Sequence, residues 1–430
     1  MNPLLTPPRE QITEIIGRIY RRGLTTTTGG NISIRDDNGN VWVTPAGIDK
    51  GSLRPADIVC VHPDGSVSGP HAPSSEIPFH LAIYKARPDL KAIVHAHPPA
   101  LVSFSIVGAF PDTNVIPQAR QVCGPIGYAH YELPGSQILG TVIAGEFAKG
   151  FNALILENHG TVVGGTDLNK AFERFETFEF VARILINANR LGKPNYLDES
   201  QIQAFEAQYN DPLPEMESVE YPSDERELRS EICRIVRRAC DQGLMISTYG
   251  TVSTRWRGED FLITPSNFSR WDIEPSDVVQ IKGEMRETGK SPSRSVHIHQ
   301  DIYRRNPDVK AIIFTQAPYS MAFGVAGKNF DNRTIPESWI LLQEVLLLPF
   351  GAHFAGQQYI SQSLHAEHPV LIIQNDSILV TGRNLLNAFD RLEVAEFSAR
   401  SLINSLSLGK MKPINEIQIE ELRKKFLPDE

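Results

Sequence analysis

Two histidines in the first quarter of the chain have the type and spacing of metal ligands. Residues 92–94 are apolar and lie between Pro88 and Pro98, which predicts a buried strand. Side chains two residues apart on a strand share a face, so we expect His95 and His97 to point the same way from its end. Two imidazoles on one face can bind a single divalent cation.

His159 is the predicted third ligand. It follows another apolar, strand-like segment at 153–156, and Gly160 beside it lets a second stretch of backbone come close. Three imidazoles leave a tetrahedral Zn²⁺ one open position, which is typical of a catalytic metal site. We therefore expect one Zn²⁺, or another divalent metal such as Mn²⁺ or Co²⁺, at His95, His97 and His159.

Glu76 is the candidate proton carrier. It begins a predicted helix, and that helix brings its carboxylate near the two histidines if it packs back on their strand. A carboxylate there could move the proton that forming an enediolate requires.

Several residues could bind a phosphate group. Gly30, with Gly29 before it, can turn backbone N–H groups toward an anion. Asn31, Ser74 and Ser75 add neutral donors, the two serines at a helix N-terminus. These residues together predict a small phosphorylated substrate.

Five motifs occur in an order that resembles the class II aldolase/adducin family. They are TTGGNIS at 27–33, VTPAG at 43–47, PSSE at 73–76, HAHPP at 95–99 and ENHG at 157–160. The resemblance implies an α/β fold with three layers (αβα) around a mixed central sheet. It also implies that Glu76 is the catalytic acid/base and that Gly47 gives a further backbone donor to phosphate.

The resemblance implies a metal-dependent aldolase that cleaves a small sugar phosphate through a metal-stabilised enediolate. Glu76 follows the two serines as in the aldolases, whereas the epimerase pattern resembles SSD. A fuculose-phosphate type of aldolase has a tyrosine acid where this chain has Gln121, and Tyr128 and Tyr131 are out of register. A metal-dependent decarboxylase or dehydratase of a phosphorylated sugar acid or ketose is therefore the alternative. A non-catalytic binding module like the adducin head is a third.

The chain also contains an internal repeat. Two pairs of segments show it most clearly: VWVTPAGIDKGSLRPADIV with FLITPSNFSRWDIEPSDVV, and NKAFERFETFEFVAR with LNAFDRLEVAEFSAR. The members of each pair are offset by roughly 217 to 220 residues along the sequence. We expect a first domain at 1–209 with the metal site, a linker at 210–224, and a degenerate domain of the same type at 225–430. The alternation of strand-like and helical segments predicts a layered α/β domain in each copy.

The second copy lacks the predicted metal ligands. Glu76, His95, His97 and His159 are replaced there by Ser295, Phe314, Gln316 and Asp376. His297 and His299 lie in a predicted helix, where side chains two apart diverge by about 200°, so we expect no metal at that pair. A structural protein would have no reason to keep all four groups in one copy and lose all four in the other.

Composition sets broader limits. A chain of 430 residues suggests two domains, and a net charge of −9 gives no basic surface for nucleic acid. No apolar run is long enough to span a membrane, the N-terminus lacks the apolar core of a signal peptide, and four cysteines show no CxxC spacing. We expect a cytoplasmic protein. The resemblance to fourfold aldolase rings implies a homodimer whose four domains form a pseudo-fourfold ring.

Overall fold

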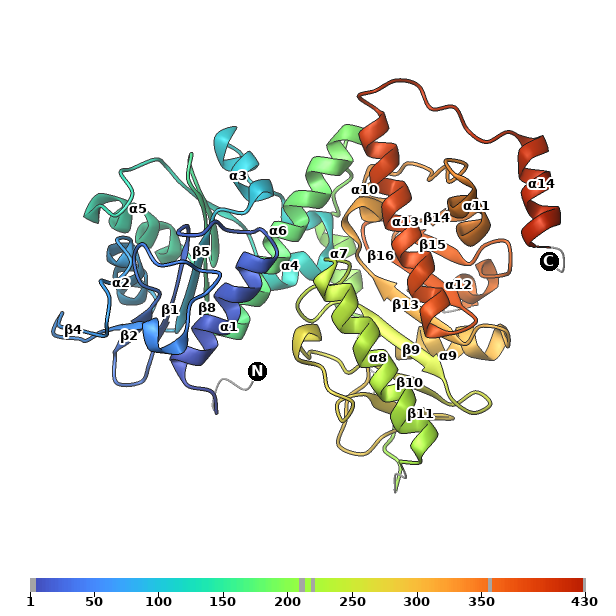
Figure 1. Cartoon of the computed structure of the whole chain (residues 1–430), viewed down its shortest axis with the longest axis horizontal. Coiled ribbons are helices and arrows are strands. Elements are labelled where there is room, and N and C mark those ends of the chain that lie inside the picture. The colour runs from blue at the N-terminus through green and yellow to red at the C-terminus, as the bar shows by residue number, and fades with distance from the viewer. Residues whose placement is uncertain (1–4, 209–212, 218–220, 355–357, 428–430) are drawn as a thin grey trace. The chain divides into compact units, whose positions relative to one another are not determined.

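Each copy of the repeat folds around its own mixed sheet of eight strands. The computed structural model describes residues 5–208, 213–217, 221–354 and 358–427 (Figure 1). The chain forms two compact units, residues 1–113 with 118–183 and residues 114–117 with 184–430. The expected fold of two tandem three-layer α/β domains is confirmed. The linker at 210–224 lies partly outside the described residues, and the domain boundaries stay a prediction.

The elements of the first copy follow the predicted alternation. They are α1 (Pro8–Arg21), β1 (Asn31–Arg35), β2 (Val41–Val43), η1 (Pro55–Asp57), β3 (Val59–Val61), β4 (Val67–Ser68), α2 (Ile77–Ala86), β5 (Ala92–Ala96), α3 (Pro99–Ile106), η2 (Thr113–Val115), α4 (Pro117–Cys123), β6 (Gly127–Ala129), α5 (Gln137–Ala148), β7 (Ala153–Leu156), β8 (Gly160–Gly165), α6 (Leu168–Leu191) and α7 (Glu199–Glu206). The strand order is β4-β3-β2-β1-β5-β8-β7-β6. Only β6 and β7 pair in parallel; the other neighbours are antiparallel.

Helices cover both faces of this sheet. Figure 1 shows α2 and α5 on one face and α1 and α6 on the other. On the α2 side, Phe79 and Phe147 pack with Leu154 in one buried cluster. On the α1 side, isoleucines at helical spacing, Ile12 and Ile19 among them, are fully buried. The strand β5, which carries the predicted ligand His95, therefore lies in the middle of a sheet that is covered on both sides.

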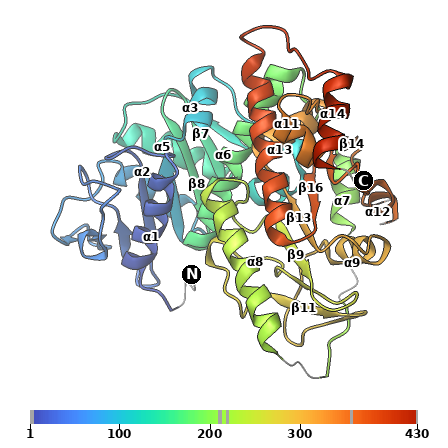
Figure 2. The same ribbon diagram turned by 45° about the vertical axis from the view of Figure 1, so that its right-hand side comes forward.

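The second copy repeats the same order of strands. Its elements are α8 (Ser223–Asp241), β9 (Thr251–Arg255), β10 (Phe261–Ile263), η3 (Arg270–Asp272), β11 (Val279–Lys282), β12 (Met285–Arg286), α9 (Val296–Arg305), β13 (Ala311–Thr315), α10 (Pro318–Ala326), α11 (Pro336–Leu342), β14 (Val345–Leu348), α12 (Gln358–Ser363), β15 (Val370–Ile373), β16 (Ser377–Gly382), α13 (Leu385–Ser405) and α14 (Glu416–Phe426). Its order, β12-β11-β10-β9-β13-β16-β15-β14, matches the first sheet position by position. Figures 1 and 2 show α8 and α13 side by side, joined by the Arg238–Glu393 ion pair.

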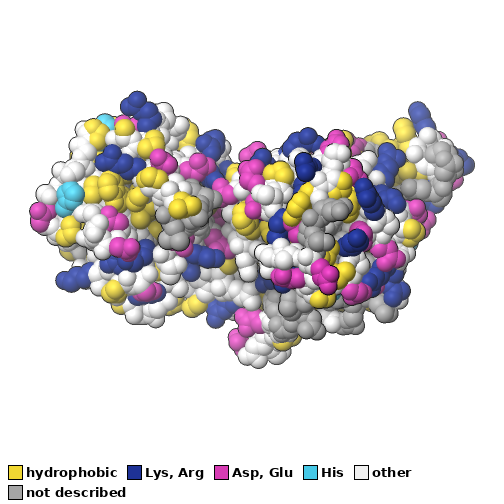
Figure 3. All heavy atoms as spheres, turned by 90° about the horizontal axis from the view of Figure 1, so that it is seen from below, with side chains coloured by type: hydrophobic (Ala, Val, Ile, Leu, Met, Phe, Trp, Pro, Cys, Tyr) yellow, Lys and Arg dark blue, Asp and Glu magenta, His cyan; other side chains and the backbone are white. Residues whose placement is uncertain are grey.

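The charges on the surface and the polarity of the helices agree with what the net charge and the hydropathy of the sequence predict. On the face seen in Figure 3, lysine and arginine side chains are interspersed with aspartate and glutamate, with no continuous basic stripe among the described residues. Among those residues no helix is both long and apolar enough to cross a membrane.

Candidate metal centre and its surroundings

His95 is held by the strand next to its own. It lies near the end of β5, paired with Asn31 of β1 on one side and Val162 of β8 on the other. Its Nδ1 donates to the carbonyl of Thr161 at 2.9 Å, and its side chain is fully buried. A donor on Nδ1 fixes the tautomer and leaves the Nε2 lone pair free for a metal.

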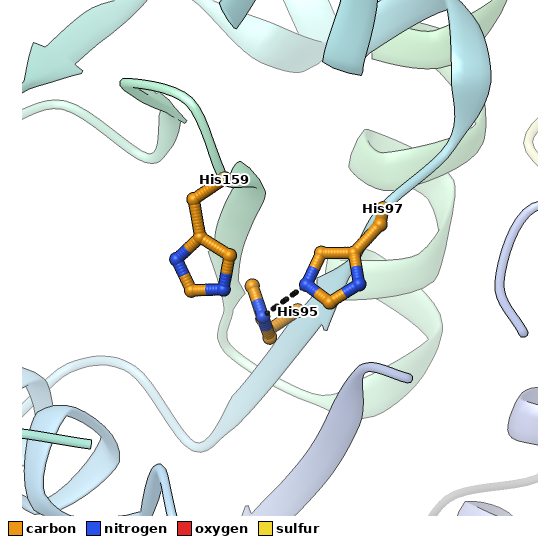
Figure 4. A group of neighbouring side chains, drawn as sticks. All are labelled: His95, His97 and His159. Atoms are coloured by element: carbon orange, nitrogen blue, oxygen red, sulfur yellow. Dashed lines mark hydrogen bonds between the residues drawn. The ribbon is translucent and has the colours of Figure 1, made fainter. Parts of the chain in front are cut away.

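His97 and His159 complete the predicted set. His97 follows the last residue of β5, and His159 lies in the turn between β7 and β8, so the three rings come from two neighbouring parts of one sheet (Figure 4). One nitrogen from each ring lies within 4.8 Å of the others, and Nε2 of His97 is 3.0 Å from Nε2 of His95. No other group of three or more potential ligands with this spacing occurs among the described residues.

Two glycines allow this close approach. A Cβ on Gly160 would lie 2.6 Å from the carbonyl oxygen of Ala96 and 2.7 Å from the ring of His97. Gly30 has φ +67°, and a Cβ there would lie 2.7 Å from the carbonyl oxygen of His95. Both contacts are too short for any other residue, so both positions require glycine beside the histidines.

The environment keeps two of the imidazoles neutral. Burial lowers the pKa of His97 to about 3, and the charges of His95 and His159 act in the same direction. Burial and the charge of His95 lower the pKa of His159 to about 4. Both rings are neutral at pH 7, which is the form that binds a metal.

Glu76 lies against the three histidines. It is the N-cap residue of α2 and is 8% exposed. Its Oε2 is 3.1 Å from Nε2 of His95, and its Oε1 is 3.3 Å from Nε2 of His159. Burial raises the pKa of Glu76, but the charge of His95, its hydrogen bond and the charge of His159 outweigh burial and hold the pKa below its usual value.

The donor set fits a divalent cation. Nitrogens converge there with a carboxylate whose Oε1 is buried and has no hydrogen-bond partner in the described structure. A cation between these groups would satisfy lone pairs that now face one another. His95, His97 and His159 would hold it, with Glu76 close enough to act as a ligand or as a base.

A buried polar network behind Glu76 was not predicted from the sequence. Asn31 donates from Nδ2 to Oε2 of Glu76 at 2.8 Å, and its Oδ1 accepts a hydrogen bond from Nε2 of His80. Nδ1 of His80 in turn lies 2.7 Å from the hydroxyl of Ser33, which also contacts the hydroxyl of Tyr84. The signal available was the repeat itself, since His80, Ser33 and Tyr84 are retained in the second copy as His299, Ser253 and Tyr303.

The predicted phosphate residues lie in adjacent loops. Ser74 N donates to the carbonyl of Thr44, and Ala46 N donates to that of Ala72, which joins the loop containing Gly47 to the loop containing Ser74 and Ser75. Gly47 has φ +68°. The Asn31 side chain is 2% exposed and is bonded to Glu76 and His80, so its amide is already engaged inside the protein.

A buried lysine beneath these loops was also missed. Lys50 is 2% exposed; its backbone N–H donates to Thr27, and its ammonium donates to the carbonyl of Pro45 at 2.9 Å. It thus connects the loop at 25–30 with the loop at 44–47. Burial lowers its pKa to about 8. The equivalent Arg270 is also buried and donates to the carbonyls of Gly250, Phe268 and Pro265.

Two further residues of interest lie outside this group. Glu157 of the ENHG motif accepts from the backbone N–H of Tyr131 at 2.9 Å, so it holds the loop after β6. Gln121 is exposed on α4. Within the described part of the chain, neither forms a hydrogen bond or an ion pair with the three histidines. Neither is therefore assigned as the proton donor to a leaving group.

The second copy holds a different set of contacts at the equivalent place. Gln316 donates from Nε2 to the carbonyl of Asp376, and Asp376 accepts from the hydroxyl of Ser377. Ser295 and Thr251 share a hydroxyl–hydroxyl hydrogen bond where Glu76 and Asn31 meet in the first copy. His299 is buried against Ser253 instead of facing a site. Gln316, Asp376, Ser295 and Thr251 thus bond to other groups of the protein.

Comparison with known proteins agrees with this geometry. A family model described as the class II aldolase and adducin N-terminal domain matches residues 10–186 and again residues 230–403. The two matches together cover most of the chain and correspond to the two copies of the repeat.

Curated relatives match about half of this chain and nearly all of their own length. A 5-deoxy-D-ribulose 1-phosphate aldolase of Bacillus thuringiensis is 33% identical over 204 residues, which is 46% of this chain and 94% of the relative. A 3-oxo-tetronate 4-phosphate decarboxylase of Haemophilus influenzae is 32% identical over 202 residues, 46% of this chain and 95% of the relative. The crystal structure of a putative aldolase/epimerase/decarboxylase from Escherichia coli has 32% identity and a TM-score of 0.42, covering 45% of this chain and 95% of that one.

Proposed function

Because the chain belongs to the class II aldolase and adducin family through both of its copies, we propose that it is a metal-dependent lyase that cleaves a carbon–carbon bond in a small sugar phosphate. The observation that supports this most directly is the convergence of His95, His97 and His159 with Glu76. Relatives named as a 5-deoxy-D-ribulose 1-phosphate aldolase and a 3-oxo-tetronate 4-phosphate decarboxylase match about half of this chain.

The metal and the protein residues have separate tasks in this proposal. A divalent cation, which we take to be Zn²⁺ or else Mn²⁺ or Co²⁺, supplies a Lewis acid that stabilises negative charge developing on a substrate oxygen. Three imidazoles would hold it and leave room for substrate. The Thr161 carbonyl fixes the orientation of the His95 ring.

Glu76 moves the proton. Its pKa lies below the usual value, so the carboxylate is ionised at neutral pH and can accept a proton from a substrate carbon or hydroxyl. The hydrogen bond from Asn31 holds Oε2 in place. Oε1 accepts no hydrogen bond from the described residues and lies 3.3 Å from Nε2 of His159, on the side of the three histidines. Gly30, Gly47, Ser74 and Ser75 are the proposed phosphate donors, since their loops adjoin one another beside Glu76.

A decarboxylase of a phosphorylated sugar acid is the second candidate, since it needs the same stabilised negative charge next to the bond that breaks. The specific observation in its favour is that the aldolase tyrosine position holds an exposed Gln121. Loss of carbon dioxide creates no aldehyde oxygen to protonate, so it would need no such acid.

One assay separates these activities. Metal-loaded protein would be given dihydroxyacetone phosphate with a panel of short aldehydes, and separately phosphorylated 3-keto acids. New carbon–carbon bonds in the first case support the aldolase, and carbon dioxide release in the second supports the decarboxylase. Inactivity on both, with one metal bound per chain, would favour a non-catalytic binding module like the adducin head.

We further propose a cytoplasmic homodimer, whose four copies form a pseudo-fourfold ring. The four cysteines are all buried and form no disulfide with one another, which suits a reducing compartment. If single domains of this type form a ring of four through like interfaces, a chain with two copies supplies two of the four domains. Two chains then complete the ring.

A further inference from the structure

The three loops proposed to bind phosphate carry no charged side chain of their own. They read TTTTGG at 25–30, TPAG at 44–47 and APSS at 72–75. Their donors are backbone N–H groups and hydroxyls, all of which are neutral. A phosphate ester carries nearly two negative charges at neutral pH. Taking such a group partly out of water is costly unless a positive charge lies nearby.

Lys50 lies at the junction of these loops. Its backbone N–H donates to the carbonyl of Thr27 at 2.8 Å, and its Nζ donates to the carbonyl of Pro45 at 2.9 Å. Pro45 also forms an isolated β-bridge with Pro73 of the third loop. All of these residues belong to the first compact unit. The Lys50 ammonium is therefore enclosed by the same three segments that are proposed to hold the phosphate.

The ammonium of Lys50 has more donors than the surrounding protein accepts. An ammonium carries three N–H bonds, and within the described part of the chain Nζ donates only to the Pro45 carbonyl. The residue is 2% exposed, so water has little access to it. Burial lowers the pKa of Lys50 to about 8, with no opposing effect from a nearby acidic group. A bound anion would accept the remaining hydrogen bonds and offset the cost of burying the charge.

The other titratable groups near Lys50 do not neutralise it. Asp49 is exposed, and its carboxylate accepts hydrogen bonds within its own turn at 2.9 Å. Tyr20 of α1 packs against the residue that follows Lys50. His97 approaches the loop at 25–30, and burial lowers its pKa to about 3, so it is neutral at pH 7. Lys50 is thus the cation that packs directly between the three loops.

The second copy fills the equivalent place in a different way. Arg270, which corresponds to Lys50, donates from three nitrogens to three backbone carbonyls. Tyr249 there replaces Gly29 and brings an aromatic ring into the first of the loops. The cation of the second copy is therefore bonded on three sides by the protein. The first copy keeps a smaller cation whose donors are mostly unused.

We propose that Lys50 supplies the positive charge with which the first copy binds a phosphate dianion, and that it is a specificity-determining residue of that site. This inference rests on the proposed action on a sugar phosphate and names a residue that governs it. The bound phosphate stabilises the ammonium in return, because opposite charges attract strongly where water is largely excluded. Above pH 8, where free Lys50 has largely lost its proton, binding therefore takes a proton up from the buffer.

Glycerol 3-phosphate is the probe for this proposal. It carries a phosphate on three carbons but has no ketone or carboxylate, so the proposed reaction cannot consume it. The second pKa of a phosphate ester is about 6, and the ligand is a dianion at pH 7.5 and above. Isothermal titration calorimetry of the metal-loaded wild type at pH 8.5, in two buffers of different ionisation enthalpy, should show uptake of about half a proton or more per ligand. The affinity should fall by about tenfold between pH 7.5 and pH 9.5.

Three variants test the residue itself. Lys50→Met should weaken binding at pH 7.5 by roughly 10- to 100-fold, the scale of one charge pair shielded from bulk water, and should abolish the proton uptake. Lys50→Arg keeps a positive charge at all these pH values, so it should bind without proton uptake and without the fall at high pH. Lys91→Met is the control, because Lys91 is exposed and paired with Asp37, and it should change neither affinity nor uptake.

Three results would overturn the proposal. These are a wild type that does not bind glycerol 3-phosphate, a wild type that binds it at pH 8.5 without proton uptake, or a Lys50→Met variant with wild-type affinity. The proton uptake is measured on the wild type, so it decides the matter even if Lys50→Met folds poorly. None of these readouts uses turnover. A protein that binds the ligand as expected but cleaves no sugar phosphate would count against the proposed activity and leave the role of Lys50 standing.

Discussion

His80 and His299 occupy equivalent positions in the two copies, but their Nε2 atoms differ in their contacts. His80 Nε2 donates to Asn31, whereas Nε2 of His299 is buried and has no hydrogen-bond partner among the described residues. Both histidines contact a serine through Nδ1 at 2.7 Å, Ser33 in one copy and Ser253 in the other. The serine contact is therefore common to both copies, and the second contact belongs to the copy with the candidate metal centre.

We predict that His80→Phe lowers turnover by about 10- to 100-fold, the range typical of residues that orient a metal ligand or catalytic group. Without His80, the Asn31 amide is no longer fixed by its oxygen, and its hydrogen bond to Glu76 becomes less ordered. The fall should appear in kcat more than in KM. Steady-state kinetics of the metal-loaded variant on the true substrate checks this.

His299→Phe is the matched control for that experiment. It removes the same Nδ1 contact with a serine in the same kind of helix, and it should cost less thermal stability than His80→Phe, which also breaks the buried bond to Asn31. Only His80→Phe should lose turnover. Equal losses of turnover in the two variants would show that the loss comes from impaired folding and not from misplacement of Asn31 and Glu76. His80→Gln, which keeps a donor for Asn31, should recover part of the rate.

Glu76→Gln should cut turnover by roughly 10²-fold or more, the usual contribution of a general acid or base. Folding and some metal binding should survive, because the amide keeps the size of the carboxylate. Ser295→Ala, at the equivalent position of the second copy, should leave the rate unchanged. A metal-replete Glu76→Gln protein with near wild-type turnover would remove Glu76 from the mechanism.

The metal content should be one divalent ion per chain. His159→Ala should reduce it sharply, since two imidazoles alone leave an incomplete site. Elemental analysis after incubation with zinc, manganese or cobalt gives the ratio directly. His297→Ala, in the helix of the second copy, should retain the full amount. Two ions per chain, or none in the wild type, would contradict the assignment.

The candidate site was predictable where residue type and short spacing carry the information. His95 and His97 stand two apart at the end of β5, and Ile12 to Ile19 of α1 repeat with helical period, so both patterns are local. The repeat then indicated which copy could hold a metal, because Phe314, the equivalent of His95, cannot bind one. The fold class followed from the resemblance and from the alternation of elements.

The other features of the fold and the site depend on contacts between residues that are far apart in the sequence. A local sequence pattern cannot predict such contacts. The pairing of β5 with both β1 and β8, and hence the bond from His95 to Thr161, joins residues 66 positions apart. His80 and Asn31 are 49 positions apart and are polar residues inside a core, where sequence alone suggests only burial. The compact units also divide within α6, at residue 184, which helical periodicity cannot show.

Lys50 gives the last prediction, which concerns stability and pH. Burial lowers its pKa from an ordinary 10.5 to about 8 in the folded protein. Between these two values the unfolded chain keeps the proton and the folded chain releases it. In this pH range the unfolded state therefore binds more protons than the folded state, so the free energy of unfolding rises with pH. The slope approaches the value for a difference of one bound proton. Below pH 8 both states are protonated, and the full penalty for burying the charge is present.

Lys50→Met removes this contribution. Urea unfolding of the wild type and the variant at pH 7.5, 8.5 and 9.5 should show the wild type gaining stability relative to Lys50→Met as pH rises. The comparison with the variant cancels the other groups that titrate in this range. Lys50→Arg introduces the residue type that the second copy buries at Arg270, and it should remain charged throughout and show no such gain. Parallel curves for wild type and Lys50→Met would mean that the ammonium is solvated in the folded protein and that its pKa is not lowered.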